Sequence, residues 1–123
     1  MALANLRTNE MQYMALIYAV PNGEEDYEGD MMADYGQFTQ DAIAAGVYVG
    51  GEALMPETDA STVRMRGGKA QITDGPFAET KETLGGYYVL DCADLNEALK
   101  WAAKIPSAKY GCVEVRPIMV FDH

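Results

Sequence analysis

Residues 11–20 have the sequence MQYMALIYAV, and this stretch decides the fold class. It is an apolar run rich in strand-forming residues, so it predicts a β-strand. Side chains alternate between the two faces of a strand. One face would carry Tyr13, Ala15 and Ile17, and the other Met14, Leu16 and Tyr18. Neither set suits solvent, so the sequence predicts a strand that is covered on both faces.

A helix and a second strand are predicted next. After an acidic stretch that ends at Asp30, apolar residues recur with helical spacing from Met31 to Ala42. The acidic start suits the positive end of the helix dipole, and Gly46 suits the left-handed residue that closes a helix. Residues 47–54 form a second strand-like run, in which Gly50-Gly51 indicates a bulge or a close approach of another backbone or a ligand.

The second half of the chain repeats this order after a hairpin. Two short strands, residues 62–66 and 69–73, are joined by Gly67-Gly68, which predicts a two-residue β-hairpin. Another strand is expected over residues 86–92. Asp94 and Glu97 have the spacing of a capping box for a helix that ends before Pro106. A final strand is predicted over residues 112–121.

These elements predict an α+β fold of the ferredoxin-like βαββαβ type, with a β-hairpin inserted in the middle and an antiparallel sheet. Right-handed crossovers would place both helices on one face. The other face would be apolar with a few charges, among them Glu114 and Arg116. Such a surface is typical of an interface, so we expect a homodimer in which the two sheets face each other.

Composition limits the classes of function. The chain has 123 residues, 49% of them hydrophobic, a formal net charge of -10 and a pI near 4.3. That charge disfavours direct binding to nucleic acid or to an anionic membrane surface. No apolar run reaches the roughly 20 residues of a membrane span, and residues 1–10 do not resemble a signal peptide. We expect a cytoplasmic protein with a flexible extension over residues 1–10 and a single domain over residues 11–123.

Metal and cofactor motifs are missing from the sequence. Cys92 and Cys112 lack the close spacing of a metal or redox pair, so we expect buried free thiols, with a bridge between neighbouring strands as the alternative. No His/Cys cluster, phosphate loop or dinucleotide fingerprint is present. The sequence therefore predicts no metal and no cofactor.

The motif Asp74-Gly75-Pro76-Phe77 follows the hairpin, and its residue types predict the local backbone structure. Pro76 fixes its own φ and lacks an N–H, and Gly75 tolerates backbone angles that a bulky residue before proline would not. The result should be a stiff turn that holds a carboxylate in place. This turn either orients a catalytic group or only connects two strands.

The stretch from Thr73 to Glu82, followed by Leu84-Gly-Gly-Tyr-Tyr88, resembles the YCII-related family in its DGPF subgroup. The resemblance extends over nearly all of residues 11–121. It implies a ferredoxin-like subunit, a dimeric α+β barrel and an active-site cleft. Enzymes of the wider family are proposed to use a His and Asp pair, but the one histidine here is His123, the last residue. Members of the subgroup also occur with sigma factors, which implies a regulatory context.

Two functions remain open. In the first, the dimer binds an unknown small molecule in a cleft at the sheet face, with a regulatory role. In the second, the protein is a small-molecule enzyme in which Asp74 is a general acid or base and Arg116 or Lys81 binds an anionic group. If the turn folds back over the strands, the groups expected to line the cleft with Asp74 are Glu52, Phe77, Glu79, Lys81, Glu114 and Arg116.

Overall fold

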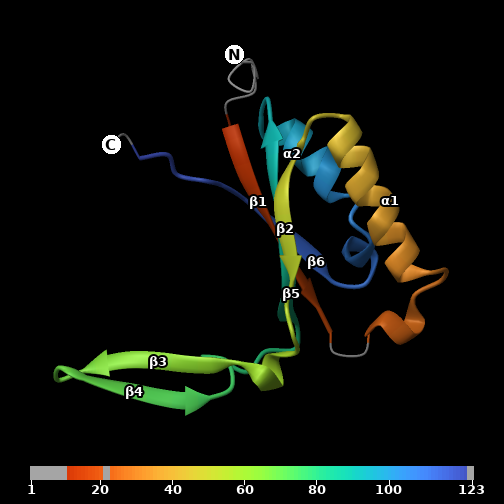
Figure 1. Ribbon diagram of the computed structural model, residues 1–123. Helices are drawn as coiled ribbons and strands as arrows, with labels where there is room; N and C mark the ends of the chain where they lie inside the picture. The colour runs from red at the N-terminus through yellow and green to blue at the C-terminus, as the bar shows by residue number, and fades with distance from the viewer. Residues whose placement is uncertain (1–10, 21–22, 122–123) are drawn as a thin grey trace.

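The computed structural model describes residues 11–20 and 23–121, so the predicted flexible extension over residues 1–10 and His123 lie outside the described residues. A four-stranded antiparallel sheet forms the body of the molecule (Figure 1). Its strands are β1 (Met11–Ala19), β2 (Tyr48–Ala53), β5 (Thr83–Cys92) and β6 (Cys112–Pro117). Helices α1 (Met31–Ala44) and α2 (Leu95–Ala102) cover one face of this sheet.

The strand order β2-β5-β1-β6 is that of a ferredoxin-like fold, and each neighbouring pair is antiparallel. The predicted α+β class, the order of the elements and the shared face of the two helices are confirmed. Strand β1 lies inside the sheet between β5 and β6. One face of β1 packs under the helices, and the apolar residues of its other face lie on the side of the sheet away from them.

The helix boundaries follow from side-chain and glycine caps. Asp30 caps α1 by accepting a hydrogen bond from the N–H of Ala33 at 3.2 Å. Gly46, with φ of 74°, closes the same helix, as predicted. Asp94 accepts from the N–H of Glu97 at 2.9 Å, which confirms the cap predicted for α2.

The core lies between the sheet and the helices. It takes alternate residues of the inner strands, including Tyr13, Ala15 and Ile17 of β1, and these pack on Phe38 and Ala42 of α1. The residues of β1 predicted to share a face therefore do so. Burial of these side chains against the helices removes apolar area from water, at roughly 25 cal/mol per Å².

Two expectations about the last strand are wrong. Strand β6 ends at Pro117 rather than at Phe121, because proline has no N–H with which to continue the ladder. Beyond it, Ile118 donates one hydrogen bond to the carbonyl oxygen of Gln12 at 2.8 Å, and the chain then leaves the sheet (Figure 1). Cys112 was expected to be buried but is exposed, since it is paired with Tyr18 and so points to the side of the sheet away from the helices, whereas Cys92 is buried.

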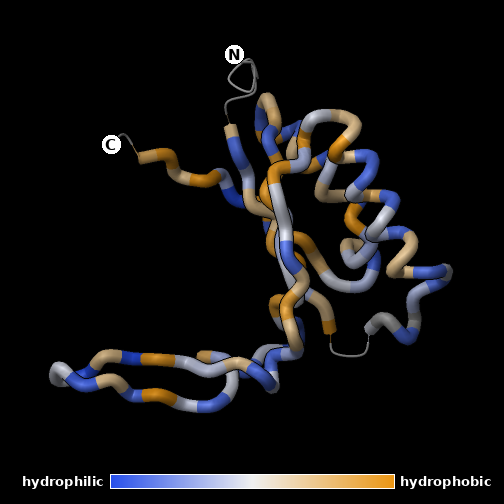
Figure 2. The backbone as a smooth tube through the Cα atoms, viewed as in Figure 1, coloured by the Kyte–Doolittle hydropathy of each residue, from blue (hydrophilic) through white to orange (hydrophobic). Residues whose placement is uncertain are grey.

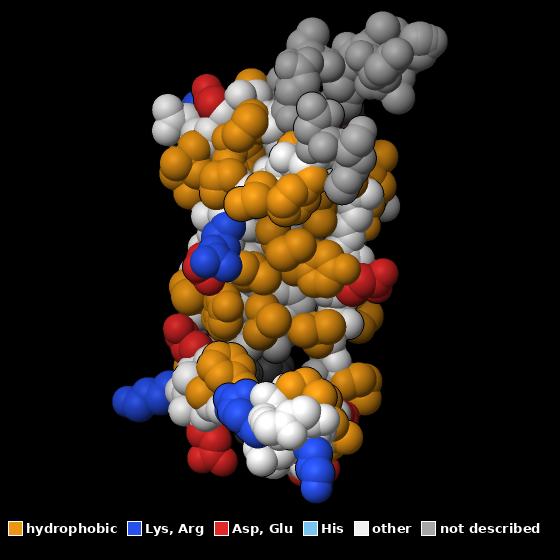
Figure 3. Space-filling view, turned by 90° about the vertical axis from the view of Figure 1, so that its left-hand side faces the viewer, with side chains coloured by type: hydrophobic (Ala, Val, Ile, Leu, Met, Phe, Trp, Pro, Cys, Tyr) orange, Lys and Arg blue, Asp and Glu red, His pale blue; other side chains and the backbone are white. Residues whose placement is uncertain are grey.

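The face of the sheet away from the helices, here called the open face, is apolar with a few charges (Figure 3). Its apolar side chains are partly buried or exposed and come from three strands: Met14, Leu16, Tyr18, Val49, Tyr87 and Val89. The charged side chains are those of Glu52, Glu114 and Arg116. Within the part of the chain described, no helix is long and apolar enough to cross a membrane.

Strands β3 (Ser61–Arg66) and β4 (Lys69–Asp74) form a separate two-stranded sheet, here called the arm. Gly67 and Gly68 have φ of 59° and 78°, so both central residues of its turn are left-handed, and the predicted two-residue hairpin is confirmed. The arm projects from the body on the side of the open face (Figure 1), and apolar residues lie in both of its strands (Figure 2).

Candidate functional site

A hollow of about 620 Å³ lies where the arm leaves the body, and we call it the base hollow. Pro76 and Phe77 of the motif line it on one side. Tyr18 and Leu84 of the sheet line it on another, together with Met55, which follows β2. Three segments that are distant in sequence thus converge there, and most of the wall is apolar.

The motif turn is held in place by the arm. Gly75 has φ of 95°, a left-handed value that favours glycine. Its N–H donates to the carbonyl oxygen of Ala60 at 2.7 Å, and its own carbonyl oxygen accepts from Thr62 Oγ1 at 2.8 Å. The Pro76 ring then fixes the chain direction. Phe77 follows with 79% of its surface exposed, a large apolar side chain held at the hollow without burial of its own.

A second, shallower hollow adjoins the first and shares Tyr18, Thr80 and Glu82 with it. It is also lined by Lys81, Cys112 and Glu114. Because the two hollows share a wall, the base hollow continues onto the β6 side of the open face.

Burial and acidic neighbours raise the pKa of two groups between these hollows. Burial raises the pKa of the Tyr18 hydroxyl, and the charge of Glu114 and a hydrogen bond to it raise that pKa further. Burial also raises the pKa of the Cys112 thiol, assisted by Glu82, whose Oε1 lies 3.6 Å from Sγ. Both groups therefore stay protonated at neutral pH, and Cys112 lacks the lowered pKa of a nucleophilic cysteine.

Four of the predicted site residues lie around these hollows. Phe77 lines the base hollow, and Lys81 and Glu114 line the adjoining one. Arg116 lies next to Glu114, with 3.5 Å between its Nε and Glu114 Oε2. Both side chains of this pair are more than a third exposed, so it contributes little to stability.

The other three predicted residues lie elsewhere. Asp74 is the last residue of β4, is exposed, and makes no side-chain hydrogen bond or ion pair with any residue that the structure describes. Glu79 is exposed and lines neither hollow. Glu52 lies on the edge strand β2, opposite Tyr87. A single chain does not bring Asp74, Glu52 and Arg116 together, and their roles stay predictions.

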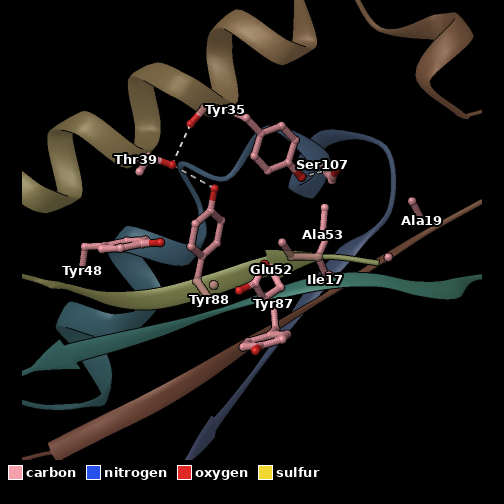
Figure 4. A pocket seen from close by; sticks show the side chains of 13 residues that line it. Ile17, Ala19, Tyr35, Thr39, Tyr48, Glu52, Ala53, Tyr87, Tyr88 and Ser107 are labelled. Carbon is pink, nitrogen blue, oxygen red and sulfur yellow. Dashed lines mark hydrogen bonds between the residues drawn. The ribbon is translucent and has the colours of Figure 1, made fainter. Parts of the chain in front are cut away.

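A third cavity, of about 340 Å³, lies on the helix side of the sheet (Figure 4). Tyr35 donates a hydrogen bond to Ser107 Oγ at 2.6 Å, and the hydroxyls of Thr39 and Tyr88 are 3.2 Å apart. Burial raises the pKa of Tyr88. Tyr88 points toward α1, and Tyr87 points to the opposite side (Figure 4). Of these adjacent tyrosines, Tyr87 therefore faces the open side.

Several lining residues were not singled out from the sequence. Tyr18 and Leu84 line the base hollow, and the strand alternation that placed Tyr18 beside Met14 and Leu16 was the signal that could have identified it. Ser107 reaches the third cavity from a short 3₁₀ helix over Pro106–Lys109, for which the sequence gives no usable signal. Over residues 11–20 and 23–121, no three His, Cys, Asp or Glu side chains are placed to hold a metal ion.

The chain is similar to known proteins over most of its length. The model of the YCII-related domain matches residues 11–122. An uncharacterised protein of Rhizobium meliloti (strain 1021) is 40% identical over 100 residues, which cover 80% of this chain and 79% of that protein. The matched region includes the motif turn, the arm and all strands of the main sheet.

Proposed function

The chain belongs to the YCII-related family, and from this premise we propose that it is a homodimeric small-molecule-binding protein of the DGPF subgroup. The observation that carries the proposal is the base hollow, which the motif residues Pro76 and Phe77 line. Its volume of about 620 Å³ falls in the range of ligand pockets, which is about 300–1,000 Å³. The subgroup motif would then serve to shape a binding site.

The chemistry of the lining favours one class of ligand. Most of the wall is apolar, and its charged side chains are the carboxylates of Glu57, Asp59 and Glu82. Among the described residues that line it there is no Lys or Arg, and the whole chain carries a formal charge of -10. An anionic ligand would be repelled. We infer a largely apolar ligand that is neutral or cationic, with its apolar part on Phe77.

The homodimer is proposed because it would cover the open face. The apolar side chains of Met14, Leu16 and Val89 lie there beside the hollows, and a second sheet packed face to face would bury them. Packed sheets are about 10 Å apart. The base hollow, at the rim of this face, would then become a cleft between the subunit and its partner.

The enzymatic alternative has less support. It assigns acid–base chemistry to Asp74 and anion binding to Arg116 or Lys81. Asp74 lines neither hollow, and Arg116 already lies beside Glu114. Since no observation favours catalysis, binding is the function that we propose, with a regulatory role as its context.

Matched ligands test this function. Naphthalene-methylamine, naphthalene-methanol and naphthoate share one apolar body and differ in charge, and each would be titrated by ligand-observed NMR. We expect the amine and the alcohol to bind and naphthoate not to bind.

A variant of the motif tests the position of the site. Phe77→Ala should weaken binding about fivefold or more, since it removes an aromatic contact. Met32→Ala is the control, because Met32 is 83% exposed on α1. Equal affinity in wild type and Phe77→Ala would refute the site.

A further inference from the structure

The arm is amphipathic, and its apolar face is bare. Residues directly opposite each other on paired strands share a face. The pairs Val63–Ile72 and Met65–Ala70 make the outer part of one face apolar, and Ser61–Asp74 follows at its base. The side chains of Val63, Met65 and Ile72 are 58%, 58% and 68% exposed. The opposite face carries Arg64, Gln71, Arg66 and Lys69.

Such a hairpin needs a surface to pack on. A two-stranded hairpin is at best marginally stable in water. Strands β3 and β4 pair with each other and with no strand of the main sheet. The alternation of apolar and polar residues is that of a strand with one buried face, so the sequence specifies a cover that residues 11–20 and 23–121 do not provide.

The length and direction of the arm place that cover on a facing molecule. Each strand of the arm has 6 residues. At about 3.4 Å per residue, the arm reaches roughly 20 Å. It projects on the side of the open face (Figure 1), where a second sheet would lie only about 10 Å away. The arm would therefore extend past the facing sheet and lie along the flank of the partner subunit.

The charge of the arm favours a second copy of this chain as the partner. Arg64, Arg66 and Lys69 are three of the nine Lys and Arg residues, in a chain with 19 Asp and Glu. These positive charges lie on the face opposite to the apolar pairs, so they attract another acidic body over distance and do not enter the apolar contact itself. The same charge pattern keeps two arms apart, because they would repel each other at close range.

The repulsion between arms selects the orientation of the two-fold axis. An axis parallel to the strands would place both cationic arms at the same end of the dimer. An axis that runs between the sheets, perpendicular to the strands, would instead place the two arms at opposite ends of the dimer. The arm leaves the sheet at one end of β2, and residues 118–121 leave β6 at the opposite end, on the same open side (Figure 1). The perpendicular axis would bring each arm to the other chain's residues 118–121.

We propose that the apolar face of each arm packs on the C-terminal segment, residues 118–121, of a second copy of this chain. This segment is apolar where it leaves the sheet, with Met119 72% and Val120 79% exposed. The contact would occur twice in a symmetric dimer and cover the apolar face of the arm together with the exposed side chains of Met119 and Val120. It extends the proposed dimer from sheet packing to an exchange of arms.

A pair of adjacent substitutions tests the face of the arm. Ile72→Asp and Gln71→Asp introduce the same side chain at neighbouring positions on opposite faces of β4. Sedimentation equilibrium should show that Ile72→Asp raises the dimer dissociation constant at least about tenfold, while Gln71→Asp leaves it near the wild-type value. Circular dichroism checks that both variants are folded. Dimers of equal strength in both variants would overturn the arm contact and leave the ligand site untouched.

A cross-linking experiment tests the partner segment. In a Cys112→Ser background, a chain with Ile72→Cys is mixed with a chain carrying Met119→Cys, and the mixture is oxidised. We expect a disulfide between the two chains, and little or none when Gln71→Cys replaces Ile72→Cys. Equal yields with both would overturn the assignment, as would a monomeric wild type. Co-sedimentation of the wild-type protein with anionic vesicles, lost in Ile72→Asp, would also overturn the assignment. It would show that the apolar face of the arm packs on lipid.

Discussion

Thr62 and Gly75 are joined across the base of the arm, where Thr62 Oγ1 donates a hydrogen bond of 2.8 Å to the carbonyl oxygen of Gly75. This bond connects the first strand of the arm to the motif turn. The turn in turn presents Phe77 to the base hollow. The direction of the arm and the shape of the hollow therefore depend on one another.

Thr62→Val should loosen this junction. The substitution keeps the shape of the side chain and removes the hydroxyl donor, so we expect a loss of about 1 kcal/mol in the free energy of unfolding. Urea denaturation measures it. Thr73→Val is the control, because Thr73 lies opposite Thr62 in the arm and its hydroxyl donates to no described residue. Equal stability in the two variants would show that the bond has no energetic role.

Asp74→Ala should leave stability almost unchanged. A capping carboxylate would cost about 1 kcal/mol when lost, but the Asp74 side chain bonds to no described residue. We expect a change within about 0.5 kcal/mol in urea denaturation. A loss above about 1 kcal/mol would show that Asp74 finds a partner in the assembled protein. Asp30→Ala, which removes an observed helix cap, is the comparison.

Gly111→Ala and Gly36→Ala should change stability in opposite directions. A Cβ on Gly111 would lie 2.8 Å from the Cα of Ala19 and still closer to the carbonyl oxygen of Tyr18, both on β1. We expect a loss of about 2 kcal/mol or more. Gly36, inside α1, has nothing within 4 Å of the place that a methyl group would occupy, so alanine there should add roughly 0.5–1 kcal/mol. Thermal unfolding of both variants distinguishes these effects.

The thiol of Cys112 should be alkylated slowly at neutral pH although it is exposed. Alkylation requires the thiolate, and the raised pKa of Cys112 lowers the thiolate fraction at any given pH below it. The rate of reaction with iodoacetamide should rise with pH, and the pH at which it reaches half its maximum should be higher than for an ordinary thiol. Glu82→Gln removes a neighbouring negative charge and should lower this midpoint. Glu57→Gln, a carboxylate that lines only the base hollow, should not.

Local signals in the sequence predicted most of the fold. Gly46, Gly67 and Gly68 stand where left-handed backbone is required, and only glycine adopts it without strain. Asp94 and Glu97 fixed the start of α2 through their own hydrogen bond. Such signals act between residues close in sequence, so they can be recognised without a structure.

The candidate site was predicted less completely, because its members come from distant segments. Phe77, Lys81 and Glu114 line the two connected hollows; strand alternation placed Tyr18 only on a face of the sheet, and nothing local indicated that Met55 would join them. Cys112 is predicted to be buried from its strand alone, but its pairing with Tyr18 puts it on the face away from the helices. Which face a residue shares depends on the pairing of distant strands.

The sequence by itself determined the elements of this protein, the antiparallel α+β class and the amphipathic hairpin, because caps, turns and strand alternation are local properties. Only the tertiary structure decided that β1 and β5 are central, that Tyr87 faces the open side, and that the arm stands away from the body. These features depend on which distant strands pair and on the burial that follows, and no short stretch such as residues 11–20 specifies them alone.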